Sequence, residues 1–349
     1  MGISHQDALQ LDRARLAGIL DKIGSIRMGV IGDGALDIYW RADMTRSELS
    51  RETPHYPLPV VEECISLGAA ANVAMNAKAL GVHAVSLLTV TGDDWREREL
   101  SALLSGNGID TSHLICSADR ITPAYIKPLR QGYGPVVYED PRLDFANLTP
   151  LPPGDEAGVI ASLGRLADSS DVIAASDQLT CGIITSGVRA KLAAVYDKCP
   201  VIADSRSRIG EFNGVIIKPN DLEAARALNR DRAGALPRDA WFDTAEALRR
   251  RTGKPAIITL GGEGALWCDE QGAILVPACP VEPPLDVVGA GDAFMVAFCC
   301  AYATGAAGPE ALVLANLAAG VVIGKIGITG TASPEEIMAM FVQYQAGMA

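Results

Sequence analysis

Short apolar runs of strand type alternate with longer runs of helical period along most of this 349-residue chain. This alternation favours a mostly parallel sheet with helices on both faces, because a crossover between parallel strands needs a long connection. We predict strands at 27–33, 85–90, 171–177, 201–204, 215–220 and 256–260, and helices at 155–166, 188–198, 239–251, 292–304 and 308–323. One large α/β unit accommodates this length, so we expect a single domain over residues 1–349.

Two segments, about 38–66 and 118–140, interrupt the alternation. Pro54, Pro57 and Pro59 exclude a helix from the first segment, which ends in a short strand at 60–65. The second segment alternates weakly and has turn residues at 131–134, so we predict a hairpin. We expect the two segments to form a small β lid beside the main sheet. A further helix is predicted at 6–23, on the surface.

Polar residues follow several of the predicted strands at the point where each strand ends. They are Asp33 with Asp37, Ser176 with Asp177, Asp204, Asn220 and Gly261. Ligands of open parallel sheets bind outside the carboxyl ends of the strands. We therefore expect these residues to share one site.

The segment Gly289-Ala290-Gly291-Asp292 stands at the start of a long apolar helix. Glycines let a ligand approach the backbone, and free amides at a helix start attract an anion. A carboxylate beside a bound phosphate is repelled by it, so Asp292 has a chemical use there as the base that takes a proton from an attacking hydroxyl. The alternative is a glycine-rich turn in which Asp292 caps the helix.

Two further segments contain residues suited to ligand binding. The run Gly32-Asp33-Gly34 resembles the start of a dinucleotide-binding turn, but Asp37 replaces the third glycine and no helical period follows. Carboxylates there suit sugar hydroxyls better. The small-residue turn at 68–71 opens a helix with Asn72 in its first turn, where Asn72 faces the ligand or is an ordinary helix residue.

The composition excludes several classes of function. A net charge of −12 makes the chain a poor partner for nucleic acids, which need a basic surface. The eight cysteines have no metal-binding spacing and suit a reducing compartment. We find no signal peptide and no apolar run long enough to span a membrane, so a cytoplasmic protein without a membrane partner is expected.

Taken together, these motifs resemble those of the PfkB (ribokinase-like) carbohydrate kinases over about residues 27–335. The matching stretches are Gly68 to Asn72, Asn220 to Glu223, TLGGEG at 259–264 and DVVGAGD at 286–292. The resemblance implies a ribokinase-like three-layer α/β sandwich with a mostly parallel central sheet, helices on both faces and a small β lid. Within the family, the segments at 50–61, 68–81, 142–147 and 314–327 look most like the heptose-7-phosphate kinase group.

The resemblance also implies roles for individual residues. Asp292 would be the catalytic base, and the amides of Gly289, Ala290 and Gly291 would stabilise the transferred phosphoryl group. Asp33, Asp37, Gly68 and Asn72 would hold the sugar. ATP and Mg²⁺ would be organised by Asn220 and Glu223, with Glu223 reaching the metal through water, and the nucleotide would be lined by Thr259, Gly261, Gly264 and Asn316. Lids of this kind often pair between subunits, which implies a homodimer through the lid.

The chain departs from the family at several positions. Ala69 replaces a second glycine, and Val287 and Val288 replace a hydroxyl residue near the anion site. Arginines at 206 and 208, with Lys127, Arg130 and Arg142, are either candidates to bind a phosphate already on the substrate or solvated surface charges. The acceptor stays open: a sugar or sugar phosphate such as heptose 7-phosphate, or fructose, ribose or a nucleoside. A non-catalytic sugar- or nucleotide-binding homologue is the remaining alternative.

Overall fold

The computed structural model describes residues 11–230, 238–327 and 329–348. Its main sheet has eight strands in the order β15-β14-β13-β12-β11-β10-β1-β4. Strands β4, β1, β10, β11, β12 and β13 are parallel, whereas β14 and β15 complete one edge as antiparallel neighbours. Their bounds are β1 Arg27–Gly32, β4 Ala84–Leu88, β10 Val172–Asp177, β11 Val201–Ser205, β12 Ile216–Ile217, β13 Ala256–Thr259, β14 Ala265–Asp269 and β15 Gly272–Val276.

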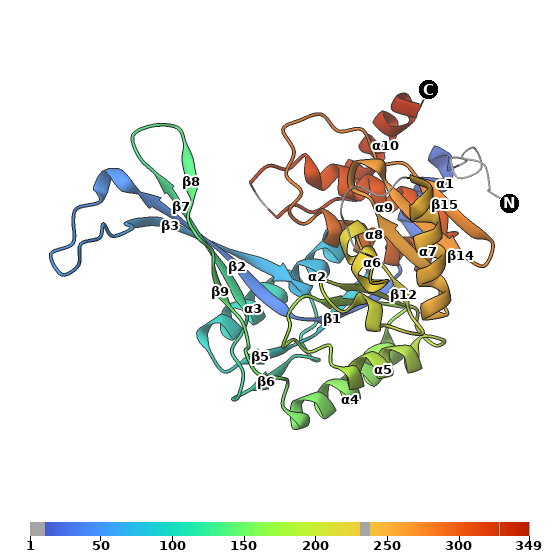
Figure 1. Ribbon diagram of the computed structural model, residues 1–349, viewed down its shortest axis with the longest axis horizontal. Helices are drawn as coiled ribbons and strands as arrows, with labels where there is room; N and C mark the ends of the chain where they lie inside the picture. The colour runs from blue at the N-terminus through green and yellow to red at the C-terminus, as the bar shows by residue number, and fades with distance from the viewer. Residues whose placement is uncertain (1–10, 231–237, 328, 349) are drawn as a thin grey trace.

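Helices cover both faces of this sheet (Figure 1). Successive residues of a strand point to opposite faces: Val30 belongs to the apolar cluster under one helical layer, and Ile31 to the cluster under the other. The first layer contains α1 Arg13–Ile23, α2 Ala70–Ala79, α8 Ala290–Ala303, α9 Gly308–Ile323 and α10 Pro334–Met348. The second contains α4 Pro153–Ser169, α5 Ser186–Val195, α6 Asp221–Ala227 and α7 Arg238–Thr252. The predicted three-layer α/β fold is confirmed.

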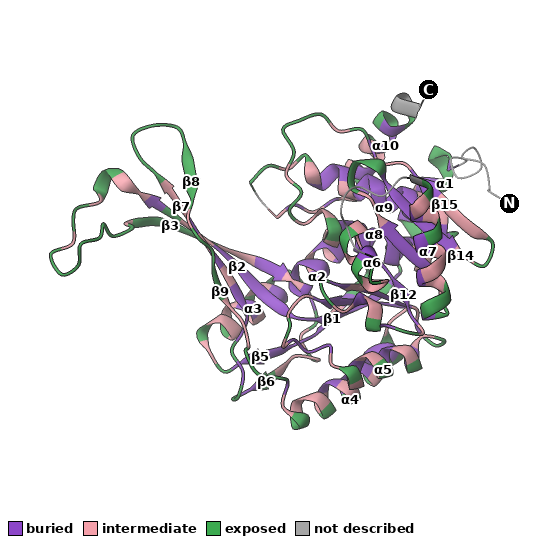
Figure 2. Ribbon diagram, viewed as in Figure 1, coloured by how far each residue is buried: buried purple, intermediate pink, exposed green. Residues whose placement is uncertain are grey.

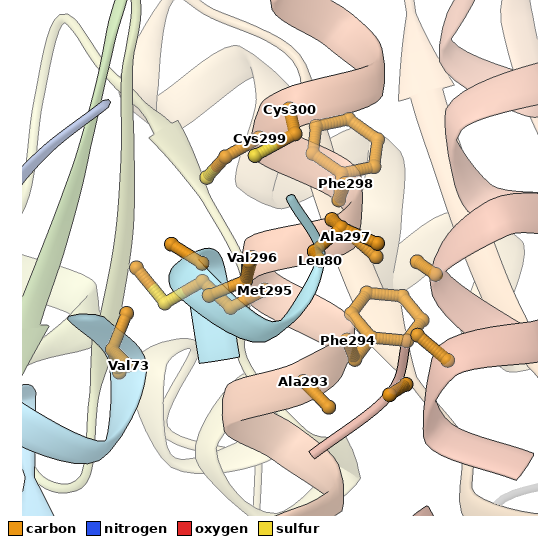
Figure 3. Packing of buried hydrophobic residues seen from close by; sticks show 14 of the residues in the cluster. Val73, Leu80, Ala293, Phe294, Met295, Val296, Ala297, Phe298, Cys299 and Cys300 are labelled. Carbon is orange, nitrogen blue, oxygen red and sulfur yellow. The ribbon is translucent and has the colours of Figure 1, made fainter. Parts of the chain in front are cut away.

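Helix α8 is deeply enclosed. Residues Ala293 to Ala301 are all buried, and the helix packs against α2 and α9. Figure 3 shows Val73 and Leu80 of α2 close to the α8 side chains. Small residues such as Ala297 allow this close approach. Because α8 and α2 are packed together, the first turns of both helices are held in a fixed relation.

A second sheet projects from the body (Figure 1). Its strand order is β3-β2-β7-β8, with β9 also paired to β7. The bounds are β2 Gly34–Asp43, β3 Val60–Ala69, β7 Ala124–Gln131, β8 Val137–Glu139 and β9 Leu143–Phe145. Its far end is exposed and its base is buried (Figure 2). Strand β2 was not predicted from the sequence, and β3 is longer than the predicted strand at 60–65. The two strands pair with each other along nearly their whole length.

The remaining elements are α3 Trp95–Gly106 and the parallel pair β5 Val90–Gly92 and β6 Ile115–Ser117. The helix predicted at 6–23 begins at Arg13, where Asp12 caps it; residues 6–10 of that prediction lie outside the described residues. Within the described ranges, no helix is both long and apolar enough to cross a bilayer.

Candidate active site

The polar strand ends meet at one edge of the main sheet. Strands β1, β10, β11, β12 and β13 run parallel, so Asp33, Asp177, Asp204, Asn220 and Gly261 follow or close strands at the same edge. These residues therefore lie at the edge of the sheet where we expect one site. Asp37 is different: it lies within β2 of the projecting sheet and reaches the site from that sheet, not from a strand end.

The first turn of α8 forms an open group of backbone amides. Gly289 caps the helix at φ +82°, a conformation that favours glycine. The amide of Ala290 makes a 3.3 Å turn bond to the Val287 carbonyl. No acceptor contacts the amides of Gly289, Gly291 and Asp292 within the described chain. Space beside the Gly291 Cα is open as well, so three amides face a region that an anion can enter.

The loop before these amides is held by a carboxylate. Asp286 accepts hydrogen bonds from the amides of Val288, at 3.0 Å, and Gly327, also at 3.0 Å. Its own amide donates to the Ile323 carbonyl at 2.9 Å. These bonds attach the loop to the end of α9, which fixes the direction in which the α8 amides point.

Asp292 and Asn72 are brought together from positions 220 residues apart. The Asn72 Nδ2 donates to Asp292 Oδ2 at 2.6 Å. Asn72 is buried and Asp292 is half-buried. Burial raises the pKa of Asp292 to about 6; the Asn72 bond and Lys218 oppose this rise, whereas the charges of Asp204 and Asp37 add to it. At neutral pH this carboxylate is ionised and still basic enough to accept a proton.

A buried cation, Lys218, lies beside this pair. Its Nζ contacts Asp204 Oδ2 at 2.9 Å. Burial alone would lower the pKa of Lys218, but Asp204, Glu223 and Asp292 together raise it above its ordinary value. No role was predicted for Lys218 from the sequence. Its position was a signal of a site residue, because this lysine ends the apolar run 215–217 close to Asn220. A buried ammonium here adds positive charge where a phosphate would be held.

Asn220 and Glu223 form a capping box at the start of α6. Asn220 Oδ1 accepts from the Glu223 amide at 2.9 Å, and Glu223 Oε2 accepts from the Asn220 amide at 2.8 Å. Burial, and then Asp204, raises the pKa of Glu223. The pairing of these two residues therefore already has a structural cause. It leaves Oε1 of Glu223 without a hydrogen bond from the described residues.

Among the described residues, no three His, Cys, Asp or Glu side chains gather as a metal cage. Mg²⁺ usually keeps several waters and binds through one or two carboxylates and the phosphates of a substrate. Glu223, with one oxygen used by the cap and one available, fits that kind of water-mediated contact. The donor set is therefore compatible with magnesium carried by a nucleotide and not with a metal bound by protein alone.

The residues proposed to hold the sugar differ in their surroundings. Asp33 is buried, and its carboxylate accepts from the amides of Gln178, Leu179 and Ile183 at 2.8–3.2 Å; burial raises the pKa of Asp33 to about 6. These bonds shape the loop after β10. Asp37, in contrast, lies close to Gly68, where an added Cβ would come within 3.2 Å of the Asp37 Cγ.

The residues proposed for the nucleotide lie around β13 and the end of β15. Thr259 closes β13 and pairs with Asn220 in an isolated bridge. Gly261 and Gly264 have φ of +56° and +104°, and a Cβ at Gly264 would meet the Val276 carbonyl at 2.1 Å. Asn316, from α9, donates to the carbonyls of Val276 and Pro277 at 3.1 and 2.9 Å. Asn316 thus holds the loop that faces Gly264.

The arginines after β11 have different surroundings. Arg208 forms an ion pair with Asp177 and donates to the carbonyls of Leu179 and Thr180, so its guanidinium already has partners. Arg206 is exposed and lines a pocket of about 240 Å³ with Arg226 and Arg251. This pocket adjoins a smaller one that contains Asp204.

The arrangement unites an anion-binding helix start, a half-buried carboxylate and a buried lysine at the sheet edge. A sequence model of the "pfkB family carbohydrate kinase" matches residues 61–146 and 214–336, more than half of the chain. The chain belongs to the pfkB family of carbohydrate kinases. The matched ranges include Asn72 and Asp292, which contact each other, and Asn220 at the same edge of the sheet.

Individual relatives match the chain over most of its length. Bifunctional protein HldE of Hyphomonas neptunium is 32% identical over 336 residues, which is 93% of this chain and 65% of that protein. HldE of Geobacter sulfurreducens is 30% identical, with 94% and 65% covered. The kinase therefore spans about two thirds of the length of these relatives.

Solved structures share the fold of the kinase. Phosphofructokinase-2 from Escherichia coli, in complex with potassium, superposes with a TM-score of 0.72 at 17% identity, covering 92% of this chain and 99% of the other. Arabidopsis thaliana ribokinase, complexed with ribose and ATP, gives 0.66 at 18% identity, with 90% and 98% covered. At these identities the comparison supports the ribokinase fold.

Proposed function

We propose that the kinase transfers the terminal phosphoryl group of ATP, with Mg²⁺, to a hydroxyl of a sugar or sugar phosphate. The observation that carries the proposal is the 2.6 Å contact between Asn72 and Asp292 beside the open amides of α8. A carboxylate next to an anion-binding turn is electrostatically unfavourable unless it removes a proton during the reaction. Asp292 is the proposed base.

Several groups of the protein would contribute to phosphoryl transfer. The amides of Gly289, Gly291 and Asp292 face the open region and would stabilise negative charge on the transferred group, with a weaker share from Ala290. Lys218 would add a positive charge on the same side. Bound Mg²⁺ would neutralise phosphate charge, and Glu223 with Asn220 would hold it through water. Thr259, Gly261, Gly264 and Asn316 would line the nucleotide.

The acceptor we favour already carries a phosphate. Burial raises the pKa of Asp37, and the charges of Lys127 and Arg142 oppose that rise. Lys127 donates to the Tyr39 hydroxyl at 2.9 Å and Arg142 pairs with Asp144 at 2.6 Å. Two cations from the projecting sheet, beside a carboxylate suited to hydroxyls, match a sugar phosphate such as heptose 7-phosphate. Fructose, ribose and nucleosides are the alternatives.

Replacing Asp292 with Asn tests the reaction. We expect ADP release to fall by about 10²-fold or more, because general base catalysis is lost. The variant should fold, since Asn removes a charge that burial, Asp204 and Asp37 disfavour. Asp21→Asn, at an exposed position of α1, is the matched control and should keep full turnover. Near-parental turnover in Asp292→Asn would reject the proposed base.

A panel of acceptors in the same ADP-release assay tests the substrate class. Hexoses, pentoses, nucleosides and their phosphates, including heptose 7-phosphate, should be ranked by kcat/KM. For a phosphorylated acceptor, Lys127→Met and Arg142→Met should raise KM for the sugar phosphate while leaving KM for the free sugar unchanged. Equal changes in KM for the sugar phosphate and for the free sugar would contradict a phosphate-binding role. Calorimetry that detects sugar binding without ADP formation for any acceptor would favour the non-catalytic alternative.

We also propose that the projecting sheet acts as a lid and joins two copies of the chain. Its outer strands β3 and β8 expose Val60, Val61, Val137 and Tyr138, and exposed apolar edge strands favour pairing with another strand. Val61→Lys should shift a dimer to a monomer in analytical ultracentrifugation. A parent protein that is monomeric at micromolar concentration would contradict the proposed dimer.

The eight free cysteines support a reducing, cytoplasmic location.

A further inference from the structure

A second asparagine, Asn76, contacts the residue that binds the proposed base. Asn76 lies one turn after Asn72 on α2 and is only 2% exposed. Its Nδ2 donates to two oxygens of Asn72: the backbone carbonyl at 3.0 Å and Oδ1 at 3.2 Å. Asn72 Nδ2 in turn donates to Asp292 Oδ2 at 2.6 Å. The three side chains form a directed chain of hydrogen bonds that ends on the proposed base.

The direction of this chain is fixed by donor and acceptor chemistry. An amide side chain has one oxygen, which accepts, and one nitrogen, which donates. If the Asn72 amide were reversed, its oxygen would face the Asp292 carboxylate and its nitrogen would face the Asn76 nitrogen. If the Asn76 amide were reversed, its oxygen would face both Asn72 oxygens. Only the observed orientations avoid these repulsions, so Asn76 reinforces the orientation of Asn72 that the Asp292 carboxylate requires.

The second amide has an energetic cost that its structural role does not explain. Asn76 Oδ1 is buried and has no hydrogen-bond partner among the described residues. Leaving a buried polar atom unpaired is unfavourable, and α2 has Ala71, Ala74 and Ala77 buried at 0% exposure nearby. An apolar residue would fill the same place on the helix without this cost. What such a residue could not do is donate to Asn72.

We propose that Asn76 is a positioning residue, which holds the Asn72 amide nitrogen toward Asp292 and thereby fixes the orientation of the catalytic carboxylate. The inference rests on the proposed kinase function. The charges of Asp204 from β11, Lys218 after β12 and Asp37 from β2 act on Asp292 electrostatically. Among the described residues, the hydrogen bond that gives the Asp292 carboxylate a direction is the one from Asn72. Without Asn76, the Asn72 amide can rotate, and the carboxylate loses its partner for part of the time.

The test compares kcat and KM of Asn76→Ala and Asn72→Ala with those of the double variant, using the acceptor with the highest turnover. We expect Asn76→Ala to lower kcat about tenfold, as for the loss of one aligned hydrogen bond, with KM for ATP unchanged. In the Asn72→Ala background, Asn76→Ala should have no further effect on kcat, because Asn76 acts only through Asn72. The acidic limb of the kcat profile should also move to higher pH, since the Asn72 bond lowers the pKa of Asp292.

Two further variants separate positioning from loss of packing. Asn76→Ser retains a donor that bonds the carbonyl four residues back but is too short for Asn72 Oδ1, so it should resemble Asn76→Ala. Ala77→Gly weakens the same helix through the lower helix propensity of glycine, so it should lower Tm and keep parental kcat. The proposal is overturned if Asn76→Ser restores kcat, if the two single losses multiply in the double variant, or if Asn76→Ala stays within twofold of the parent.

These outcomes are distinct from failure of the proposed function. If the parent protein turns over none of the acceptors, the kinase proposal fails before Asn76 is tested. If the parent is active and Asn76→Ala is equally active, only the positioning role is wrong. Should Asn76→Ala fold poorly in a melting experiment, Asn76→Ser measured against Ala77→Gly still decides between the two roles.

Discussion

Replacing Ala69 with glycine should stabilise the protein, which is unusual for a change that removes a side chain. Ala69 has φ +50° and ψ −128° and precedes the first turn of α2. Residues other than glycine rarely adopt this conformation, and holding one there costs about 1–3 kcal/mol. The sequence comparison with the family already indicated a glycine at this position. The structure shows why: the turn between β3 and α2 requires positive φ.

The expected gain follows from two opposing terms. Glycine would remove the strain but would lose more backbone entropy on folding, which costs about 0.4–1 kcal/mol. The net effect is a stabilisation of about 0.5–2 kcal/mol. With an unfolding entropy of about 2.1 cal/mol/K per residue, a 349-residue chain should gain about 1–3 °C in Tm. The more relaxed turn leaves Asn72 in place, so kcat should change little.

Differential scanning calorimetry at a fixed scan rate measures this gain. The matched control is Ala74→Gly, the same chemical change in the middle of α2, where helical backbone makes glycine unfavourable by about 1 kcal/mol. The two variants should shift Tm in opposite directions. If both lower Tm, the backbone at Ala69 is not strained and the reasoning fails.

Three other changes probe the site. The kcat of the parent should rise with pH through a midpoint near 6 and then level off. The raised pKa of Asp292 keeps its carboxyl group protonated below that pH. A midpoint at or below 4 in a profile from pH 4 to 8 would contradict this expectation. Lys218→Met leaves Asp204 without its buried cation, and urea unfolding should show a loss of about 3–5 kcal/mol. Asn316→Ala removes both hydrogen bonds to the loop after β15 and should lower the free energy of unfolding by about 1–3 kcal/mol. It should also raise KM for ATP more than it lowers kcat. An unchanged KM for ATP would contradict a role of Asn316 in nucleotide binding.

The sequence predicted the layers of the fold because they depend on local pattern. Apolar runs of strand length between helical runs specify a parallel sheet, and the strand ends then meet at one edge whatever the details of packing. The same reasoning missed strand β2. Residues 34–43 of β2 pair with β3 and β7, and these long-range partners, not local propensity, extend the strand through Asp37.

Side-chain roles were harder to predict because one residue type serves several purposes. Asn220 and Glu223 match a kinase motif, yet their spacing is also that of a capping box, which they form. Arg208 carries the charge expected of a phosphate ligand, but Asp177 and two carbonyls surround its guanidinium. Lys218 gave the opposite error: its place at the end of an apolar strand is a local signal, but its buried partner, Asp204, comes from another strand. In each case the deciding neighbour is distant in sequence.

The charges and the hydrogen bond around Asp292 explain why these motifs occur together. Asp292 is useful as a base only if its carboxylate stays ionised next to a phosphate, which burial and the charges of Asp204 and Asp37 oppose. Asn72 and Lys218 offset that opposition, one by a hydrogen bond and the other by charge. Both come from elements whose positions are set by the enclosed α8–α2 contact and the parallel sheet. A pKa near 6 is thus the balance of these opposing groups, low enough for an ionised base at neutral pH and high enough for that base to accept a proton.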